Sequence, residues 1–65
     1  MRVTILPDCQ VKVVDAATVS DLLTRLGLHQ DAHLVVRGED ILTSDVELAS
    51  ADEIQIYPVI SGGHG

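Results

Sequence analysis

A single cysteine, Cys9, in a chain of only 65 residues restricts how this protein can fold more than any other sequence feature. A domain of this size buries only about 60% of the surface of its unfolded chain, and small domains often rely on disulfides or a metal. One cysteine excludes an internal disulfide, and three histidines without paired cysteines do not match a structural zinc site. Stability must come from a core, which is almost entirely aliphatic because Tyr57 is the only aromatic residue.

Size and charge also limit the function. A chain this short has little room for the walled pocket of an enzyme, so we expect a protein on which partner enzymes act. Ten acidic and four basic residues give a net charge of −6, and the scattered bases exclude direct nucleic-acid binding. The acidic surface favours docking onto basic proteins or simply solubility. No apolar run approaches the ~18 residues of a membrane span and no signal peptide is recognisable, so we expect a cytoplasmic protein.

Short β-branched segments separated by turns predict five strands, at residues 2–6, 11–14, 34–37, 41–42 and 54–59. Proline and aspartate at 7–8 form the turn of an antiparallel hairpin between the first two strands. In the second strand, alternation places Val11 and Val13 inward and Lys12 outward. Pro58 must lie near the end of the last strand, because proline has no N–H to donate to a neighbour.

One helix is predicted between the second and third strands. Thr18 is the expected N-cap, with Asp21 three residues later in a variant of the capping box, and Gly27 is the expected C-cap. The apolar face consists of Val19, Leu22, Leu23 and Leu26. His29 and His33 are four residues apart, but Gly27 has already ended the helix. We therefore interpret them as solvated loop histidines and expect no metal site.

The resulting order, β-β-α-β-β-β, predicts an α+β fold in which one main helix crosses one face of a mixed sheet of four to five strands. Residues 1–59 form the domain, and residues 60–65 form a flexible tail because three of its last four residues are glycine. If Leu34 and Val36 face the helix, Val35 lies on the opposite face of the sheet. Together with Tyr57 it forms the predicted partner-binding patch.

The chain as a whole resembles the ubiquitin-like sulfur carriers of the ThiS/MoaD family, which have the β-grasp fold. This family includes thiamine, molybdopterin and tRNA-thiolation types. The length fits the first and last of these, and the Val-Arg-Gly-Glu-Asp-Ile-Leu and Ile-Ser-Gly-Gly stretches are most similar to bacterial tRNA 2-thiouridine carriers. The segments that carry the resemblance are residues 18–23, 35–42, 52–56 and 59–63.

The resemblance implies a mechanism in which the carrier is a co-substrate. An E1-like enzyme adenylates the terminal glycine with ATP, and a sulfur donor (a cysteine desulfurase or rhodanese) converts it to a thiocarboxylate. A sulfur-accepting biosynthetic enzyme then uses that sulfur in tRNA thiolation or in thiamine or other cofactor synthesis. By resemblance, Gly63 is the activated residue, and Ser61, Gly62 and Gly63 are recognised in the partner's channel. The carrier itself is expected to bind no cofactor.

This chain departs from the family at its end, because His64 and Gly65 follow the two glycines. A JAMM-type metalloprotease could remove these two residues, Gly65 could itself be activated, or transfer activity could have been lost. Two other functions remain open. The protein could be a modifier conjugated to target lysines, or a β-grasp binding module that transfers nothing.

Overall fold

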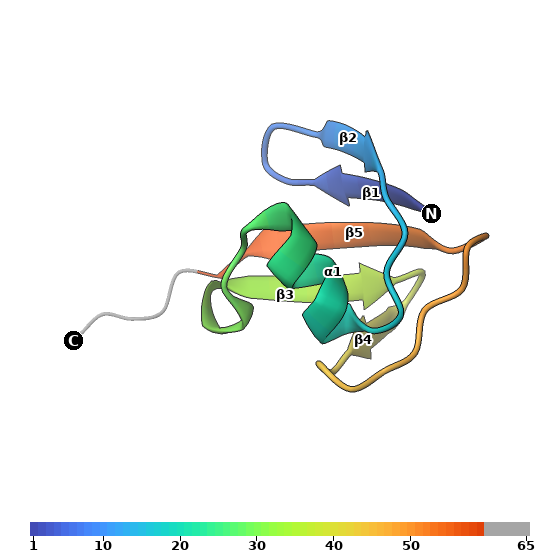
Figure 1. Cartoon of the computed structure of the whole chain (residues 1–65). Coiled ribbons are helices and arrows are strands. Elements are labelled where there is room, and N and C mark those ends of the chain that lie inside the picture. Colours follow the sequence, from blue (N-terminus) through green and yellow to red (C-terminus); the bar gives the residue numbers. More distant parts are fainter. Residues whose placement is uncertain (60–65) are drawn as a thin grey trace.

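A computed structural model describes residues 1–59, which form a five-stranded sheet with one α-helix (Figure 1). The elements are β1 (Arg2–Ile5), β2 (Gln10–Val13), α1 (Val19–Leu26), η1 (Gln30–Ala32), β3 (His33–Arg37), β4 (Asp40–Leu42) and β5 (Glu53–Pro58). The predicted order of strands and helix is confirmed. The short 3-10 helix η1 was not predicted. The expected tail, 60–65, lies outside the described residues.

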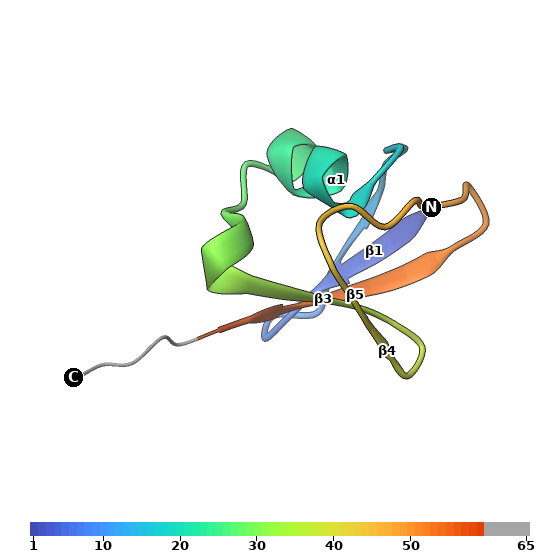
Figure 2. The same ribbon diagram turned by 90° about the horizontal axis from the view of Figure 1, so that it is seen from below.

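The strands lie in the order β2-β1-β5-β3-β4, with β1 and β5 parallel and every other neighbouring pair antiparallel. Helix α1 crosses one face of this mixed sheet, and the opposite face has no covering element among the described residues (Figure 2). This α+β arrangement confirms the predicted β-grasp fold. No helix within residues 1–59 is long and apolar enough to cross a membrane.

The aliphatic core lies between α1 and the central strands. In the sheet, Val35 lies opposite Ile56 on one side and Leu42 on the other, and Val3 lies opposite Ile54. Directly paired residues share one face of a sheet, so these side chains all point toward α1. The buried hydrophobic set is Met1, Val3, Val19, Leu22, Leu23, Val35, Leu42, Ile54 and Ile56.

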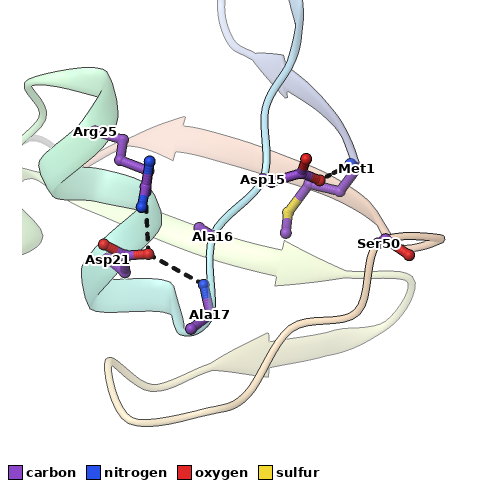
Figure 3. A pocket seen from close by; sticks show the side chains of 7 residues that line it. All are labelled: Met1, Asp15, Ala16, Ala17, Asp21, Arg25 and Ser50. Atoms are coloured by element: carbon purple, nitrogen blue, oxygen red, sulfur yellow. Dashed lines mark hydrogen bonds and ion pairs between the residues drawn. The ribbon is translucent and has the colours of Figure 1, made fainter.

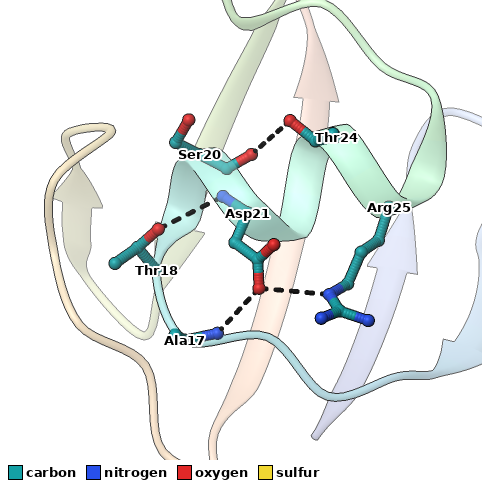
Figure 4. Close-up of polar contacts among 6 residues, drawn as sticks. All are labelled: Ala17, Thr18, Ser20, Asp21, Thr24 and Arg25. Atoms are coloured by element: carbon teal, nitrogen blue, oxygen red, sulfur yellow. Dashed lines mark hydrogen bonds and ion pairs between the residues drawn. The ribbon is translucent and has the colours of Figure 1, made fainter.

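Both ends of α1 are capped as predicted, and Figure 4 shows the contacts at its start. The Thr18 hydroxyl accepts a hydrogen bond from the Asp21 N–H at 3.2 Å. The Asp21 carboxylate accepts a hydrogen bond from the Ala17 N–H at 3.1 Å. In a standard capping box the bond comes from the N–H of the N-cap itself, so this contact lies one residue earlier in the chain. Gly27 ends the helix with φ of 72°, a left-handed conformation that glycine adopts without a Cβ clash. These local contacts define a helix of 8 residues.

Two predictions about which side chains face inward are wrong. Val35 is only 2% exposed and belongs to the core, whereas Leu34 and Val36 lie on the uncovered face. Val11 and Val13 are also on that face, opposite Thr4 and Arg2, and are 56% and 81% exposed. Leu34, Val35 and Val36 are all apolar, and the two polar residues of β3, His33 and Arg37, have the same phase as the buried Val35, so they do not indicate which face is inward. The pairing with Ile56 sets it instead.

Candidate functional site

The uncovered sheet face carries an apolar surface at one end. Tyr57 of β5 lies opposite Leu34, and Val36 lies opposite both Gln55 and Ile41. Ile41 is 65% exposed and Tyr57 42% exposed, while Leu34 and Val36 are half-buried. We call Leu34, Val36, Ile41 and Tyr57 the sheet patch. Several contiguous apolar side chains on an otherwise charged small domain are typical of a protein-docking surface.

Of the two residues predicted for this surface, the structure places Tyr57 there and removes Val35. Sequence reasoning missed Leu34, Val36 and Ile41. A usable signal was present, because a two-residue turn at Gly38 and Glu39 makes Arg37 and Asp40 the closing pair of the hairpin. That register places Ile41 opposite Val36.

The end of β5 positions the start of the C-terminal segment. Pro58 lies at the end of β5, near the strand end as predicted, although the strand stops one residue before the expected residue 59, and it lies opposite His33. The next residue, Val59, donates its N–H to the Ala32 carbonyl of η1 at 2.8 Å. On the other side, the Leu6 N–H donates to the Ile56 carbonyl at 2.8 Å. The segment that leads to the predicted functional glycines is therefore held on the β1 side as far as Ile56 and on the η1 side as far as Val59. Ser61, Gly62, Gly63 and Gly65 lie outside the described part of the chain.

Ion pairs attach the ends of the strands to the loops. Arg37 contacts Asp52 at 3.0 Å, and Asp52 also accepts the Ala49 N–H at 2.8 Å. These contacts, the backbone hydrogen bond first, lower the pKa of Asp52 below its usual value. At the start of β5, Arg2 pairs with Glu53 at 3.6 Å. These pairs stabilise the connection into β5 and contribute no group to the sheet patch.

A hollow beside the start of α1 is lined by charged and small residues, namely Met1, Asp15, Ala16, Ala17, Asp21, Arg25 and Ser50 (Figure 3). Its Asp21 carboxylate contacts the Ala17 N–H and, at 3.1 Å, the Arg25 Nε, and both contacts lower the pKa of Asp21. The Met1 ammonium donates to the Val14 carbonyl at 2.9 Å and lies 3.6 Å from Asp15. These groups are engaged in holding the helix start and β1, so we assign this hollow a structural role.

The histidine pair shows no ligand geometry. His29 is exposed, His33 is the first residue of β3, and the Nδ1 of His33 lies 2.9 Å from the His29 carbonyl oxygen. Within residues 1–59, no group of three or more histidine, cysteine or acidic side chains is arranged to hold a metal ion.

Comparison with known proteins gives consistent results. The model of the ThiS family matches residues 3–63 of this chain. A curated relative is the sulfur carrier protein TtuB of Thermus thermophilus, which is 35% identical over 54 residues. The aligned part covers 83% of this chain and 83% of the relative. The family match includes all five strands, save the first residue of β1, and ends at Gly63, so His64 and Gly65 lie beyond it.

Proposed function

The chain belongs to the ThiS family, and from this premise we propose that it is a sulfur carrier whose C-terminal glycine is converted to a thiocarboxylate. Its role is that of a substrate for partner enzymes. The family match through Gly63 is the observation that carries the proposal, and the likeness to the sulfur carrier TtuB supports it.

The chemistry follows from the weakness of a carboxylate as an acyl donor. An E1-like enzyme joins the glycine carboxylate to the α-phosphate of ATP, forming an acyl adenylate and releasing pyrophosphate. Hydrosulfide attacks the acyl carbon. AMP leaves with the oxygen it shares with the acyl group, and the thiocarboxylate and a proton remain. A persulfide delivered by a cysteine desulfurase or rhodanese attacks in the same way but forms an acyl disulfide, which a second thiol cleaves to the thiocarboxylate while a disulfide forms on the donor side. ATP is bound by the partner, so the carrier needs only an accessible end and a recognisable body.

Gly63 is the residue proposed to be activated, after a JAMM-type protease removes His64 and Gly65. The end of the family match at Gly63 supports this choice over activation of Gly65. Ser61, Gly62 and Gly63 then enter the partner's channel, which glycine favours because it has no side chain. The thiocarboxylate donates its sulfur to an accepting enzyme in tRNA thiolation, as the likeness to TtuB favours, or in thiamine or other cofactor synthesis.

Reconstitution with ATP, sulfide and the cognate E1-like enzyme tests the activated residue. Chains ending at Gly63 and full-length chains are compared by intact mass, which increases when sulfur replaces one oxygen. We expect the increase only in the chain ending at Gly63. An increase in the full-length chain would make Gly65 the activated residue. No increase in either chain would refute the carrier mechanism and favour a binding module, and adducts on lysine would favour a protein modifier.

The sheet patch is the surface that we propose the E1-like enzyme recognises. The Tyr57→Asp variant removes an exposed aromatic side chain and places a charge within the contact. We expect about tenfold or greater loss of affinity, because aromatic anchors dominate such interfaces. The Val13→Asp variant is a matched control, since Val13 is on the same sheet face but on the distant strand β2 and is 81% exposed. Equal losses in both variants would exclude a localised patch.

A further inference from the structure

We propose that the groove between α1 and β4 binds an extended, positively charged segment of a partner protein, at a site that includes residues of α1 and excludes Val36 and Tyr57 of the sheet patch. We call it the β4 groove. It lies on the helix side of the sheet and has a volume of about 400 Å³. The groove shares Leu34 and Ile41 with the edge of the sheet patch, but its helix residues and residues 42–44 lie outside that patch, so this site goes beyond the proposed carrier function.

The walls of the β4 groove come from three elements. Helix α1 contributes Val19 and Leu23, β3 contributes residues 33–35, and β4 with the loop after it contributes residues 41–44. Gln30 and Asp31 of η1 close one end. The floor is aliphatic and well packed, since Val19, Leu23 and Val35 are each 2% exposed. An aliphatic side chain entering the groove would therefore meet a preformed surface and would require little rearrangement.

The outer wall of this groove is the free edge of a strand. Among the described strands, β4 is the last of the sheet and pairs only with β3. Residues 37 and 40 close a two-residue hairpin, and antiparallel pairs alternate between bonded and non-bonded. The peptide groups of Ile41 consequently point away from β3. They offer one donor and one acceptor to an extended segment laid alongside, as in β-strand addition.

Charge identifies the kind of segment that fits. Glu39, Asp40, Asp45 and Glu47 surround β4, and none of them forms an ion pair within residues 1–59. No basic residue occurs between positions 38 and 52. Each arginine is paired with another acid, and Lys12 is in β2, on the opposite edge of the sheet. The uncompensated negative charge beside the β4 groove complements arginine or lysine flanking an aliphatic centre.

One of these acids, Asp45, directly follows Thr43 and Ser44 of the groove lining. The Thr43 hydroxyl donates to Asp45 at 2.6 Å, and this hydrogen bond lowers the pKa of Asp45. Residue 44 is tied to the helix, since the Ser20 N–H donates to the Ser44 carbonyl at 3.0 Å. A partner in the β4 groove contacts Leu34 and Ile41 but leaves Val36 and Tyr57 of the sheet patch available to a second protein.

The test uses the ¹⁵N-labelled full-length protein and two synthetic peptides. Each peptide has a Val-Ile-Val centre, flanked by arginines in one and by glutamates in the other. We expect the arginine peptide to shift the amide signals of Val19, Leu23 and Thr43 while those of Gln55 and Tyr57 stay in place. Affinity should fall when salt is raised from about 0.1 M to about 1 M, because the Debye length shortens from about 10 Å to about 3 Å.

The paired variant Glu39→Gln/Asp40→Asn should weaken binding about threefold to tenfold, as expected for the loss of two exposed ion pairs. Asp8→Asn is the matched control, because Asp8 is also exposed and outside any described ion pair but lies in the β1–β2 turn. Thermal unfolding verifies that both variants fold. Four outcomes would each overturn the proposal. In the first three, the arginine peptide does not bind, the glutamate peptide binds with equal affinity, or the arginine peptide shifts the Tyr57 signal instead of those of the groove. In the fourth, Asp8→Asn weakens binding of the arginine peptide as much as the paired variant does. The mass test of the carrier function is unaffected by any of these results.

Discussion

Threonine substitutions at two adjacent valines test which face of β3 packs against the helix. Val35 is 2% exposed between Ile56 and Leu42, whereas Val36 is half-buried on the uncovered face. Threonine has nearly the shape of valine but brings a hydroxyl, and burying a hydroxyl costs about 1–3 kcal/mol in protein mutants. Val35→Thr should lower the free energy of unfolding by that amount, and Val36→Thr should lower it by less than about 0.5 kcal/mol.

These losses are large for a domain of 65 residues. At about 0.05–0.15 kcal/mol per residue, its total free energy of unfolding is on the order of 3–10 kcal/mol. Urea unfolding followed by far-UV circular dichroism should show a midpoint lower by about 1–3 M for Val35→Thr, if the denaturant dependence is about 1 kcal/mol per M. The midpoint of Val36→Thr should remain close to that of the unchanged chain.

Aspartate at the same two positions gives a qualitative version of the experiment. A carboxylate at position 35 would lose the burial of valine, about 1.5–3 kcal/mol, and add a desolvation cost of several kcal/mol. The sum approaches or exceeds the total stability, so Val35→Asp should be unfolded at neutral pH while Val36→Asp folds. A folded Val35→Asp together with an unfolded Val36→Asp would refute the register of β3.

Three further outcomes are expected. Thr18→Ala should cost about 1 kcal/mol in urea unfolding because the Asp21 N–H loses its acceptor, and an equal cost for the exposed Thr24→Ala would contradict this capping role. Asp21 and Asp52 have folded-state pKa values below their unfolded ones, so their contribution to stability is complete above about pH 4 and is lost as the pH falls through the lowered values. Asp52→Asn should therefore flatten the loss of stability in acid, measured by thermal unfolding, and an unchanged acid profile would count against the Ala49 and Arg37 contacts. Lys12→Ile should promote self-association along β2, because an edge lysine opposes strand pairing, and a monomer in sedimentation at high concentration would exclude that role.

The elements of this fold could largely be predicted because their signals are local. Thr18, Asp21 and Gly27 define the helix through contacts within a few residues, so its limits were readable from the sequence. The order of strands and helix along the chain was readable for the same reason, since β-branched runs and turn residues alternate. The short η1 was missed because the segment 30–32 has no apolar periodicity and no side-chain cap.

The candidate site was only partly predictable, because a docking face depends on the phase of each strand. Tyr57 was placed correctly since Ile54 and Ile56 set the phase of β5. Val35 was placed on the wrong face because its neighbours are equally apolar. Val13 was expected inward because it is hydrophobic, but β2 is an edge strand at which all four side chains are exposed.

The sequence by itself determined the class of fold, the caps of the single helix and the family, because each rests on residues near one another or on a match along the whole chain. Only the tertiary structure decided which side chains form the sheet patch and the β4 groove. The physical reason is that a strand has two faces, and an apolar strand has no preference between them until pairing sets its register. In this protein, the pairing of Val35 with Ile56 turns Leu34 and Val36 outward and makes the uncovered face available to a partner.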